Sequence, residues 1–279
     1  MLALERRNLI LEKLQEEKRV VVNELSQQFG VSEETIRRDL EKLEKEGLAT
    51  KSYGGAVLNE STSIDMPFNV RKKANVSGKQ KLAELAAKCI HDGDHIILDA
   101  SSTAVFIAKA IKDKENLTVI TNSIEIIIEL SDVSDWNIIC SGGSLREGYL
   151  ALVGPKTAEG FSSFNADKAF FSCKGIDMEK GITDGNEMFS RTKQVMMHSA
   201  REAILAVDSS KFDRIAFSKL CNVEDMDTII TDKKPENRRQ LPIRKHREER
   251  ENGIASAVPF SHFSIDAVTF DISKAPIPL

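Results

Sequence analysis

The chain has 279 residues, of which 41% are hydrophobic, 29% charged and 6% aromatic, and its formal net charge is −4. This length and composition exclude a disordered or fibrous protein and leave room for a small and a medium domain. Because the sequence has neither an apolar run of about 18 residues nor an apolar start, we expect no membrane partner and a cytoplasmic location. Four widely spaced cysteines and five scattered histidines predict neither disulfides nor a metal site.

The first 58 residues predict three helices and a β hairpin. Apolar residues recur at helical spacing, Ser32 is a good N-cap for the third helix, and the Gly54-Gly55 pair is typical of a hairpin turn. The expected elements are helices over residues 3–17, 24–29 and 32–46, a short β-branched run at 19–22, and strands over 48–53 and 56–58. This order is that of a winged helix-turn-helix, a mainly α DNA-binding domain that we place at residues 1–58.

The outer face of the third helix carries the candidate DNA contacts. Arginine can make paired hydrogen bonds to guanine or phosphate, threonine near the helix start can contact a base edge, and Lys51 and Tyr53 on the hairpin can contact phosphates. The expected DNA-binding residues are Ser32, Glu34, Thr35, Arg37, Arg38, Lys42, Lys51 and Tyr53. The alternative is an ordinary solvated helix face, since residues 1–58 carry 10 Lys and Arg against 11 Asp and Glu.

One stretch of this segment resembles a known family. Arg6, Ile10 and Leu14, followed by Ser32-x-x-Thr-Ile-Arg-Arg-Asp-Leu40, are similar to the N-terminal signature of the DeoR/GlpR family of bacterial transcriptional repressors. The resemblance implies that Ser32, Thr35 and the two arginines approach operator DNA. It also implies that Asp39 supports the local structure.

Residues 59–78 lack a clear period and predict a linker, after which strands and helices alternate over residues 79–232. This alternation favours an α/β domain with a largely parallel sheet. The expected strands are residues 95–98, 117–120, 136–140, 168–171, 203–207 and 228–230, and the expected helices are residues 79–90, 103–111, 124–130, 155–161 and 187–199.

The residues that follow these strands are small and polar. Ligands of open α/β sheets bind beyond the carboxyl ends of the strands, helix starts hold phosphates, and lysines neutralise them. The expected effector-binding residues are Asp99, Ser101, Ser102, Thr103, Thr121, Asn122, Gly142, Gly143, Lys174, Glu187, Lys193 and Lys211. Taken singly, each segment is equally typical of a turn or a helix cap.

This second domain also resembles the DeoR/GlpR family, whose sensor domain is similar to the ribose-5-phosphate isomerase fold and binds phosphorylated sugars. The landmarks include Asp99-x-Ser-Ser-Thr103, Thr121-Asn122 and Gly181-Ile-Thr-Asp-Gly-Asn-Glu187. Relatives commonly have Asp-x-Gly-Thr-Thr at the first of these motifs. Without that glycine, the range of backbone φ and ψ angles allowed at this position is smaller. Similarity to regulators of rhamnose use implies rhamnulose 1-phosphate as the effector.

Residues 233–279 depart from the family pattern. The composition changes within a few residues to a basic stretch and then to an end that contains serine and proline. One hypothesis is that a frameshift replaced the natural terminus, and another is that a basic tail contacts DNA.

These patterns together predict a DNA-binding repressor of a sugar catabolic operon, controlled by a phosphorylated sugar. We expect a homo-oligomer without enzyme activity or a cofactor, associated with the nucleoid when bound to operator DNA. The alternative is a sugar-phosphate isomerase-like enzyme fused to a DNA-binding domain, with Asp99, Asp184 or Glu187 as its base. A ligand-binding module with a vestigial DNA element is a third reading, against which the intact arginine pair argues.

Overall fold

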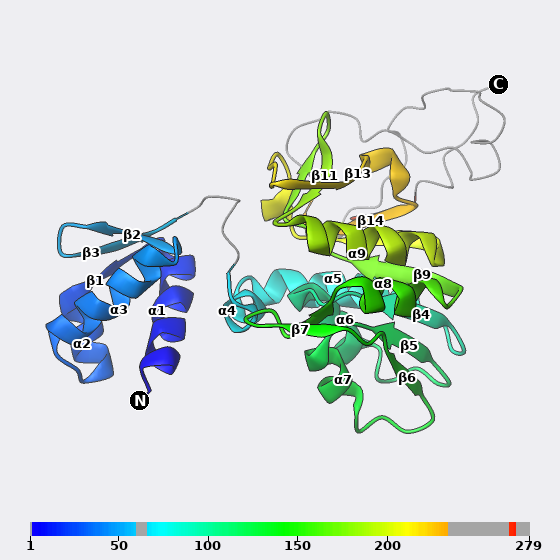
Figure 1. The fold of residues 1–279 in the computed structure, drawn as a ribbon, viewed down its shortest axis with the longest axis horizontal. Helices are drawn as coiled ribbons and strands as arrows, with labels where there is room; N and C mark the ends of the chain where they lie inside the picture. Colours follow the sequence, from blue (N-terminus) through cyan, green and yellow to red (C-terminus); the bar gives the residue numbers. More distant parts are fainter. Residues whose placement is uncertain (1, 60–65, 234–267, 272–279) are drawn as a thin grey trace. The chain divides into compact units, whose positions relative to one another are not determined.

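The structure is a computed structural model that describes residues 2–59, 66–233 and 268–271. The chain divides into two compact units, Met1–Val76 and Ser77–Leu279. Both are drawn in Figure 1.

The first unit is the predicted winged helix-turn-helix. Its helices are α1 (Ala3–Glu17), α2 (Val22–Phe29), α3 (Glu33–Lys45) and α4 (Phe68–Lys73), and its strands are β1 (Arg19–Val21), β2 (Ala49–Ser52) and β3 (Gly55–Leu58). The three strands form one antiparallel sheet in the order β1-β3-β2. The wing hairpin is therefore attached to the helices through β1.

The core of this unit is formed by one stripe from each helix. Ile10, Leu14, Ile36 and Leu40 are fully or almost fully buried, in the helical spacing that the sequence predicts. Gly55 fits against β1 so closely that an added Cβ would lie 1.9 Å from the carbonyl oxygen of Val20. Only glycine therefore lets β3 approach β1 at this point.

Helix α4 lies within the segment predicted as a linker. Val70 is fully buried in the core of the first unit, and Lys73 forms an ion pair with Glu12 of α1 at 2.8 Å. Helix α5 (Val76–Lys88) begins before residue 79. Within the described part of the segment, residues 68–73 therefore belong to the packed first unit.

The second unit is built on a seven-stranded sheet in the order β15-β14-β12-β9-β4-β5-β6. Its strands are β4 (His95–Leu98), β5 (Thr118–Thr121), β6 (Asn137–Cys140), β9 (Ala166–Phe171), β12 (Ala200–Ala206), β14 (Thr228–Thr231) and β15 (Val268–Asp271). All neighbouring pairs are parallel except β14 with β15. The predicted α/β class and largely parallel sheet are confirmed.

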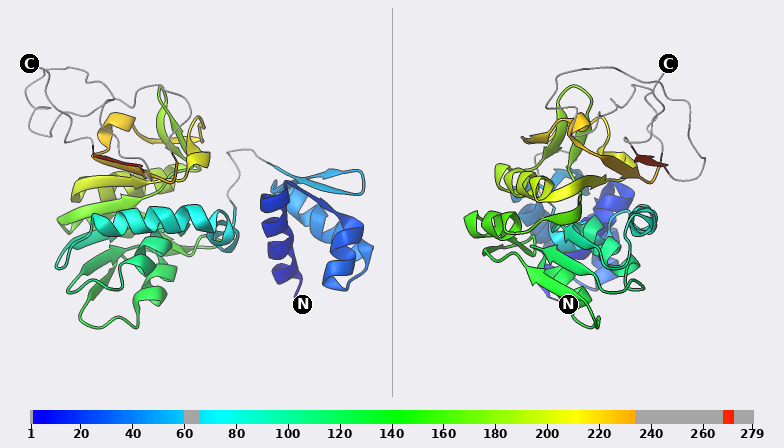
Figure 2. Two further views of the ribbon diagram at one scale, coloured as in Figure 1. Left: turned by 180° about the vertical axis from the view of Figure 1, so that it is seen from behind. Right: turned by 90° about the vertical axis from the view of Figure 1, so that its right-hand side faces the viewer.

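Helices cover both faces of this sheet. Helices α8 (Pro155–Ser162) and α9 (Glu187–His198) pack together on one face, and α6 (Ser102–Ala110) and α7 (Ile124–Leu130) pack together. Figure 1 looks onto α8 and α9, whereas the view from behind in Figure 2 shows α5 on the opposite face. The chain runs in one direction along the sheet from β4 through α6 to β5 and through α7 to β6, and in the opposite direction through α8 to β9 and through α9 to β12. Because parallel strands are joined by right-handed crossovers, the two pairs of helices lie on opposite faces of the sheet.

Two small sheets stand beyond the carboxyl ends of the central strands. One is the hairpin of β7 (Ser144–Arg146) and β8 (Ala151–Val153), and the other joins β10 (Gly175–Asp177), β11 (Gly181–Asp184) and β13 (Ser218–Cys221). The sequence patterns did not predict these strands. Each has only three or four residues, which is too short for a clear alternation.

Part of the predicted atypical tail, residues 233–279, is described. Strand β15 pairs antiparallel with β14, with Val268 opposite Thr231 and Asp271 opposite Thr228. The hypotheses of a frameshifted terminus and of a basic tail that contacts DNA concern all of residues 233–279, of which residues 234–267 and 272–279 lie outside the described residues. Within the described ranges, none of the helices has the length and apolar content needed to cross a bilayer.

Candidate DNA-binding surface and effector site

Helix α3 begins at a well-formed cap. The Ser32 hydroxyl accepts a hydrogen bond from the backbone N–H of Thr35 at 3.3 Å, and the two hydroxyls lie 2.9 Å apart. The turn before it is closed by Gly30, which adopts a left-handed φ of +63°. Such a cap fixes the start of the helix, so the side chains of its first two turns have a defined direction.

The expected base-contacting arginines lie on the exposed face of α3. The side chains of Arg37 and Arg38 are 53% and 74% exposed. Arg37 donates to Glu33 at 2.6 Å and Arg38 donates to Glu34 at 3.3 Å. Lys42 is exposed on the same helix. These side chains are free of the core and available to a partner.

A buried ion pair holds α3 against α1. Arg6 donates to the carboxylate of Asp39 at 2.6 Å, and their side chains are 8% and 6% exposed. This contact gives a physical basis to the expectation that Asp39 supports the local structure. Arg37 and Arg38 therefore lie on a helix whose opposite face is held against α1 by this ion pair.

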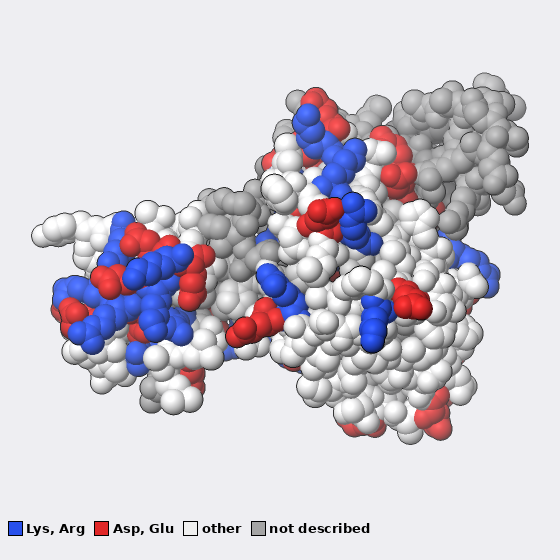
Figure 3. Space-filling model, viewed as in Figure 1, with Lys and Arg blue, Asp and Glu red and all other residues white. Residues whose placement is uncertain are grey.

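The wing carries the other two predicted residues. Tyr53 is fully exposed at the turn of the β2–β3 hairpin, and Lys51 forms an ion pair with Glu41 of α3 at 2.8 Å. The charge of Lys51 and its hydrogen bond lower the pKa of Glu41, so this carboxylate is ionised at neutral pH. Lys, Arg, Asp and Glu side chains are interspersed over this face of the first unit (Figure 3).

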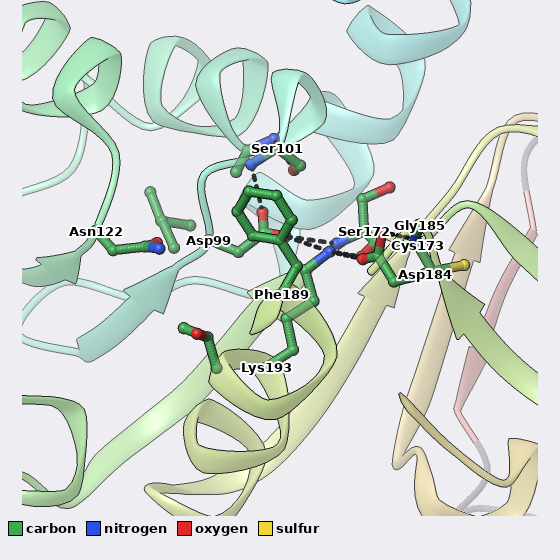
Figure 4. A network of polar contacts seen from close by, with 12 residues as sticks. Asp99, Ser101, Asn122, Ser172, Cys173, Asp184, Gly185, Phe189 and Lys193 are labelled. Atoms are coloured by element: carbon green, nitrogen blue, oxygen red, sulfur yellow. Dashed lines mark hydrogen bonds and ion pairs between the residues drawn. The ribbon is translucent and has the colours of Figure 1, made fainter. Parts of the chain in front are cut away.

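In the second unit, Lys193 of α9 is the centre of a polar network (Figure 4). Its ammonium donates to the carbonyl of Ser172 at 2.6 Å and to Asp184 at 2.5 Å, and it lies 3.3 Å from Asp99. Burial alone would lower the pKa of Lys193, but the charges of Asp184 and Asp99 outweigh it and raise that pKa above its ordinary value. Lys193 is therefore protonated, and its contacts connect residues at the carboxyl ends of β4, β9 and β11.

Asp99 connects this network to the start of α6. One carboxylate oxygen accepts from the backbone N–H of Ser101 at 3.0 Å and the other from that of Ser172 at 3.1 Å. The Ser101 hydroxyl caps the helix by accepting from Ala104, and Ser102 and Thr103 are buried in its first turn. Three predicted residues that follow β4 thus lie beside Asp99 at one helix N-terminus.

Asn122 follows β5 and lies on the other side of Asp99 from Ser172 (Figure 4). Its amide nitrogen donates to Leu152 of the β7–β8 hairpin at 2.8 Å, while its buried Oδ1 finds no hydrogen-bond partner within the described part of the chain. Thr121 is fully buried and donates to the carbonyl of Leu98 at 2.7 Å. Thr121 is therefore a structural contact, whereas Asn122 retains an acceptor for a ligand.

Gly142 and Gly143 follow β6 in left-handed conformations, with φ of +73° and +115°. The Thr157 hydroxyl donates to the carbonyl of Gly142 at 2.7 Å, and a Cβ on Gly143 would lie 2.0 Å from that hydroxyl oxygen. Gly143 is thus required by the close packing of this turn on α8, whereas Gly142 is favoured by its left-handed backbone alone. Neither takes part in the contacts of the Lys193 network.

Lysines outnumber aspartates in and beside the network. Electrostatic interactions connect the lysines Lys79, Lys174, Lys193 and Lys211 with the aspartates Asp99, Asp184 and Asp208. Burial lowers the pKa of Lys174 to about 8, against the pull of Asp184. Burial would raise the pKa of Asp208, but Lys211 and hydrogen bonds from Ser210 outweigh it and lower that pKa. With all seven side chains ionised, the cluster carries one excess positive charge.

The remaining predicted effector residue, Glu187, lies apart from these contacts. It is exposed on the first turn of α9 and pairs with Arg191 at 2.7 Å. A pocket of about 270 Å³ lies at the other end of α9, beside His198, Arg201 and Asp227, and none of the predicted residues lines it. The predicted residues are brought together by the Lys193 network and not by this pocket.

The site also contains residues that were not among the predicted effector-binding ones. Ser172 and Asp184 bind Lys193 directly, Phe189 packs on Tyr149 with ring centroids 4.8 Å apart, and Lys79 interacts with Asp208 (Figure 4). Ser172 follows the predicted strand β9, so its position along the chain was a usable signal, whereas Asp184 ends β11, which the sequence patterns did not predict. Phe189 and Lys79 lie within helices, where nothing in the sequence separates them from core or surface residues.

Comparison with known proteins agrees with both units. A family model described as the DeoR-like helix-turn-helix domain matches residues 6–62. A second, described as the DeoR C terminal sensor domain, matches residues 74–233, which is more than half of the chain.

Named relatives match over most of their length. The chain is 42% identical to the HTH-type transcriptional regulator YulB of Bacillus subtilis, over 83% of this chain and 90% of that one. It is 31% identical to the glycerol-3-phosphate regulon repressor of Escherichia coli, over 83% of this chain and 91% of that one. Among solved structures, ribose 5-phosphate isomerase A from Methanocaldococcus jannaschii aligns at 18% identity with a TM-score of 0.37, over 50% of this chain and 55% of that one.

Proposed function

Because the chain belongs to the DeoR family of transcriptional regulators, we propose that it represses a sugar catabolic operon under the control of a phosphorylated sugar. The observation that carries this proposal is the Lys193 network with further lysines beside it at the carboxyl edge of the sheet, in the same chain as an exposed recognition helix. The first supplies a site for an anion, and the second supplies a surface for DNA.

In this proposal α3 enters the major groove of the operator. Arg37 and Arg38 contact base edges or phosphates, Thr35 contacts a base near the helix start, and Lys51 and Tyr53 of the wing contact the backbone. The exposure of the two arginines and the fixed start of α3 at Ser32 support this arrangement.

The effector's phosphate would sit at the N-terminus of α6. The backbone N–H groups of the first turn and the dipole of the helix favour an anion there. Lys174, Lys193 and Lys211 supply positive charge nearby, and the unpartnered Oδ1 of Asn122 can accept a hydrogen bond from a sugar hydroxyl. The name of the relative from E. coli contains a phosphorylated metabolite, which supports this ligand class.

The geometry argues for binding without turnover. A catalytic base needs a carboxylate that is open to its substrate. Asp99 and Asp184 both pair with Lys193 and accept backbone hydrogen bonds, and Glu187 pairs with Arg191 outside the network. Asp99 and Asp184 are therefore engaged, and Glu187 lies away from the network.

We further propose that the chain acts as a homo-oligomer. Two recognition helices would then contact half-sites spaced by one DNA turn or a multiple of it, and the effector would change that spacing. The effector can work in this way only if it binds the two arrangements with different affinities.

A thermal-shift screen of the full chain against sugar phosphates, with rhamnulose 1-phosphate included, tests the proposal. We expect one phosphorylated sugar to raise the unfolding temperature and to change binding to DNA from upstream of the chain's own operon. Lys211→Ala should abolish the effector response and preserve DNA binding. The matched control is Lys180→Ala, at an exposed lysine between β10 and β11, which should retain both.

Turnover of a sugar phosphate by the purified chain would reject the proposal and favour the enzyme. A normal effector response in the Lys211 variant would reject the assignment of that lysine to the site.

A further inference from the structure

The two acidic residues that open α3 have different environments. Glu33 is fixed from two sides, because it accepts from Arg37 at 2.6 Å and from the side-chain amide of Asn23 in α2 at 3.3 Å. Glu34 pairs with Arg38 at 3.3 Å, and its side chain is 62% exposed, against 40% for Glu33. Glu33 therefore positions Arg37, whereas Glu34 points outward on the face presented to DNA.

Beyond its pairing with Arg38, an outward carboxylate on this face is unfavourable beside DNA unless a base donates a hydrogen bond to it. Phosphates repel it, and residues 1–58 carry no net positive charge that would compensate. In the major groove the base donors are the N4 amino group of cytosine and the N6 amino group of adenine. The adenine amino group lies beside the N7 acceptor, which disfavours a carboxylate, so cytosine is the base that suits Glu34.

The position of Arg38 determines which cytosine this is. Residues four apart in a helix are about 6 Å apart along its axis, whereas successive base pairs are about 3.4 Å apart. Their side chains therefore reach neighbouring base pairs more easily than one shared pair. Arginine contacts O6 and N7 of guanine. The ion pair between Arg38 and Glu34 keeps these two side chains side by side, so they would contact adjacent base pairs.

We propose that Glu34 is a specificity-determining residue, which accepts a hydrogen bond from the cytosine next to the guanine that Arg38 contacts. This inference rests on the proposed DNA-binding role of α3. It predicts a cytosine next to a guanine in each operator half-site, and it explains why a DNA-binding face carries an exposed carboxylate.

Selection from a random-sequence DNA duplex library with the full chain tests the proposal. The wild-type chain should enrich a site with that cytosine. Glu34→Gln should change the preferred base from cytosine to adenine at this one position, because glutamine pairs with adenine N6 and N7. We expect the cytosine preference to fall by about fivefold or more.

Glu46→Gln is the matched control, since it removes the same charge from an exposed carboxylate at the other end of α3. It should leave the preferred bases unchanged. The proposal is overturned if Glu34→Gln selects the wild-type site, or if the Glu46 variant shows the same change of base preference. A wild-type chain that enriches no sequence would instead overturn the proposed function.

Discussion

Replacement of Asp39 by alanine should destabilise the winged helix unit selectively. The change leaves the guanidinium of Arg6 buried without its partner, because both side chains are less than a tenth exposed and the pair is 2.6 Å long. Breaking a buried ion pair costs about 3 to 5 kcal/mol. A unit of this size has a stability of roughly 4 to 11 kcal/mol, so the loss is a large fraction of the total.

Amide hydrogen exchange of the full chain measures this effect unit by unit. Exchange in α1 and α3 should become about 10² to 10³ times faster, whereas exchange in β4 and β9 should not change. Glu34→Ala is the matched control, because it breaks an exposed pair on the same helix and should cost less than about 1 kcal/mol.

A double variant separates the charge from the packing. Replacing Arg6 by methionine and Asp39 by leucine should recover most of the lost protection, since apolar residues of similar volume can substitute for a buried ion pair. If Asp39→Ala cost no more than the Glu34 control, the reasoning about the buried charge would be refuted.

Three further changes have expected outcomes. Gly55→Ala should displace the wing, because its Cβ would lie 1.9 Å from the Val20 carbonyl, and DNA affinity should fall with little change in the second unit's unfolding temperature. Lys193→Met should lower that temperature, since two buried aspartates lose their cation at a cost of about 3 to 5 kcal/mol, and an unchanged melting curve would contradict this. The affinity for a phosphorylated effector should fall as the pH rises through about 8, because Lys174 loses its charge there. Titration calorimetry between pH 7 and 9 checks this, and Lys174→Met should remove the pH dependence.

The periodicity of the sequence predicted most of the fold. Helix α3 and its cap at Ser32 are visible in sequence because the cap and the buried stripe are local features. The parallel strands were predictable because each is a short apolar run between polar turns. Helix α4 was missed because it has six residues, and its burial of Val70 depends on contacts with α1.

The candidate effector site was predictable in place but not in detail. Residues after β4, β5 and β9 were expected at one edge of the sheet, and the structure brings Asp99, Asn122 and Lys174 to that edge. The central contacts of Lys193 were not predictable, because they join residues that are 9 and 94 positions apart in the chain. Likewise β13 pairs with β11 across more than 30 residues of the chain.

Equilibrium binding of the full chain to DNA from upstream of its own operon measures whether the outer face of α3 binds DNA. We expect a specific complex whose affinity falls by roughly 30-fold or more when Arg37 and Arg38 are both replaced by alanine, with the hydrogen exchange of α1 unchanged. Equal affinity of the double variant and the wild-type chain would show that this face of α3 does not contact the operator.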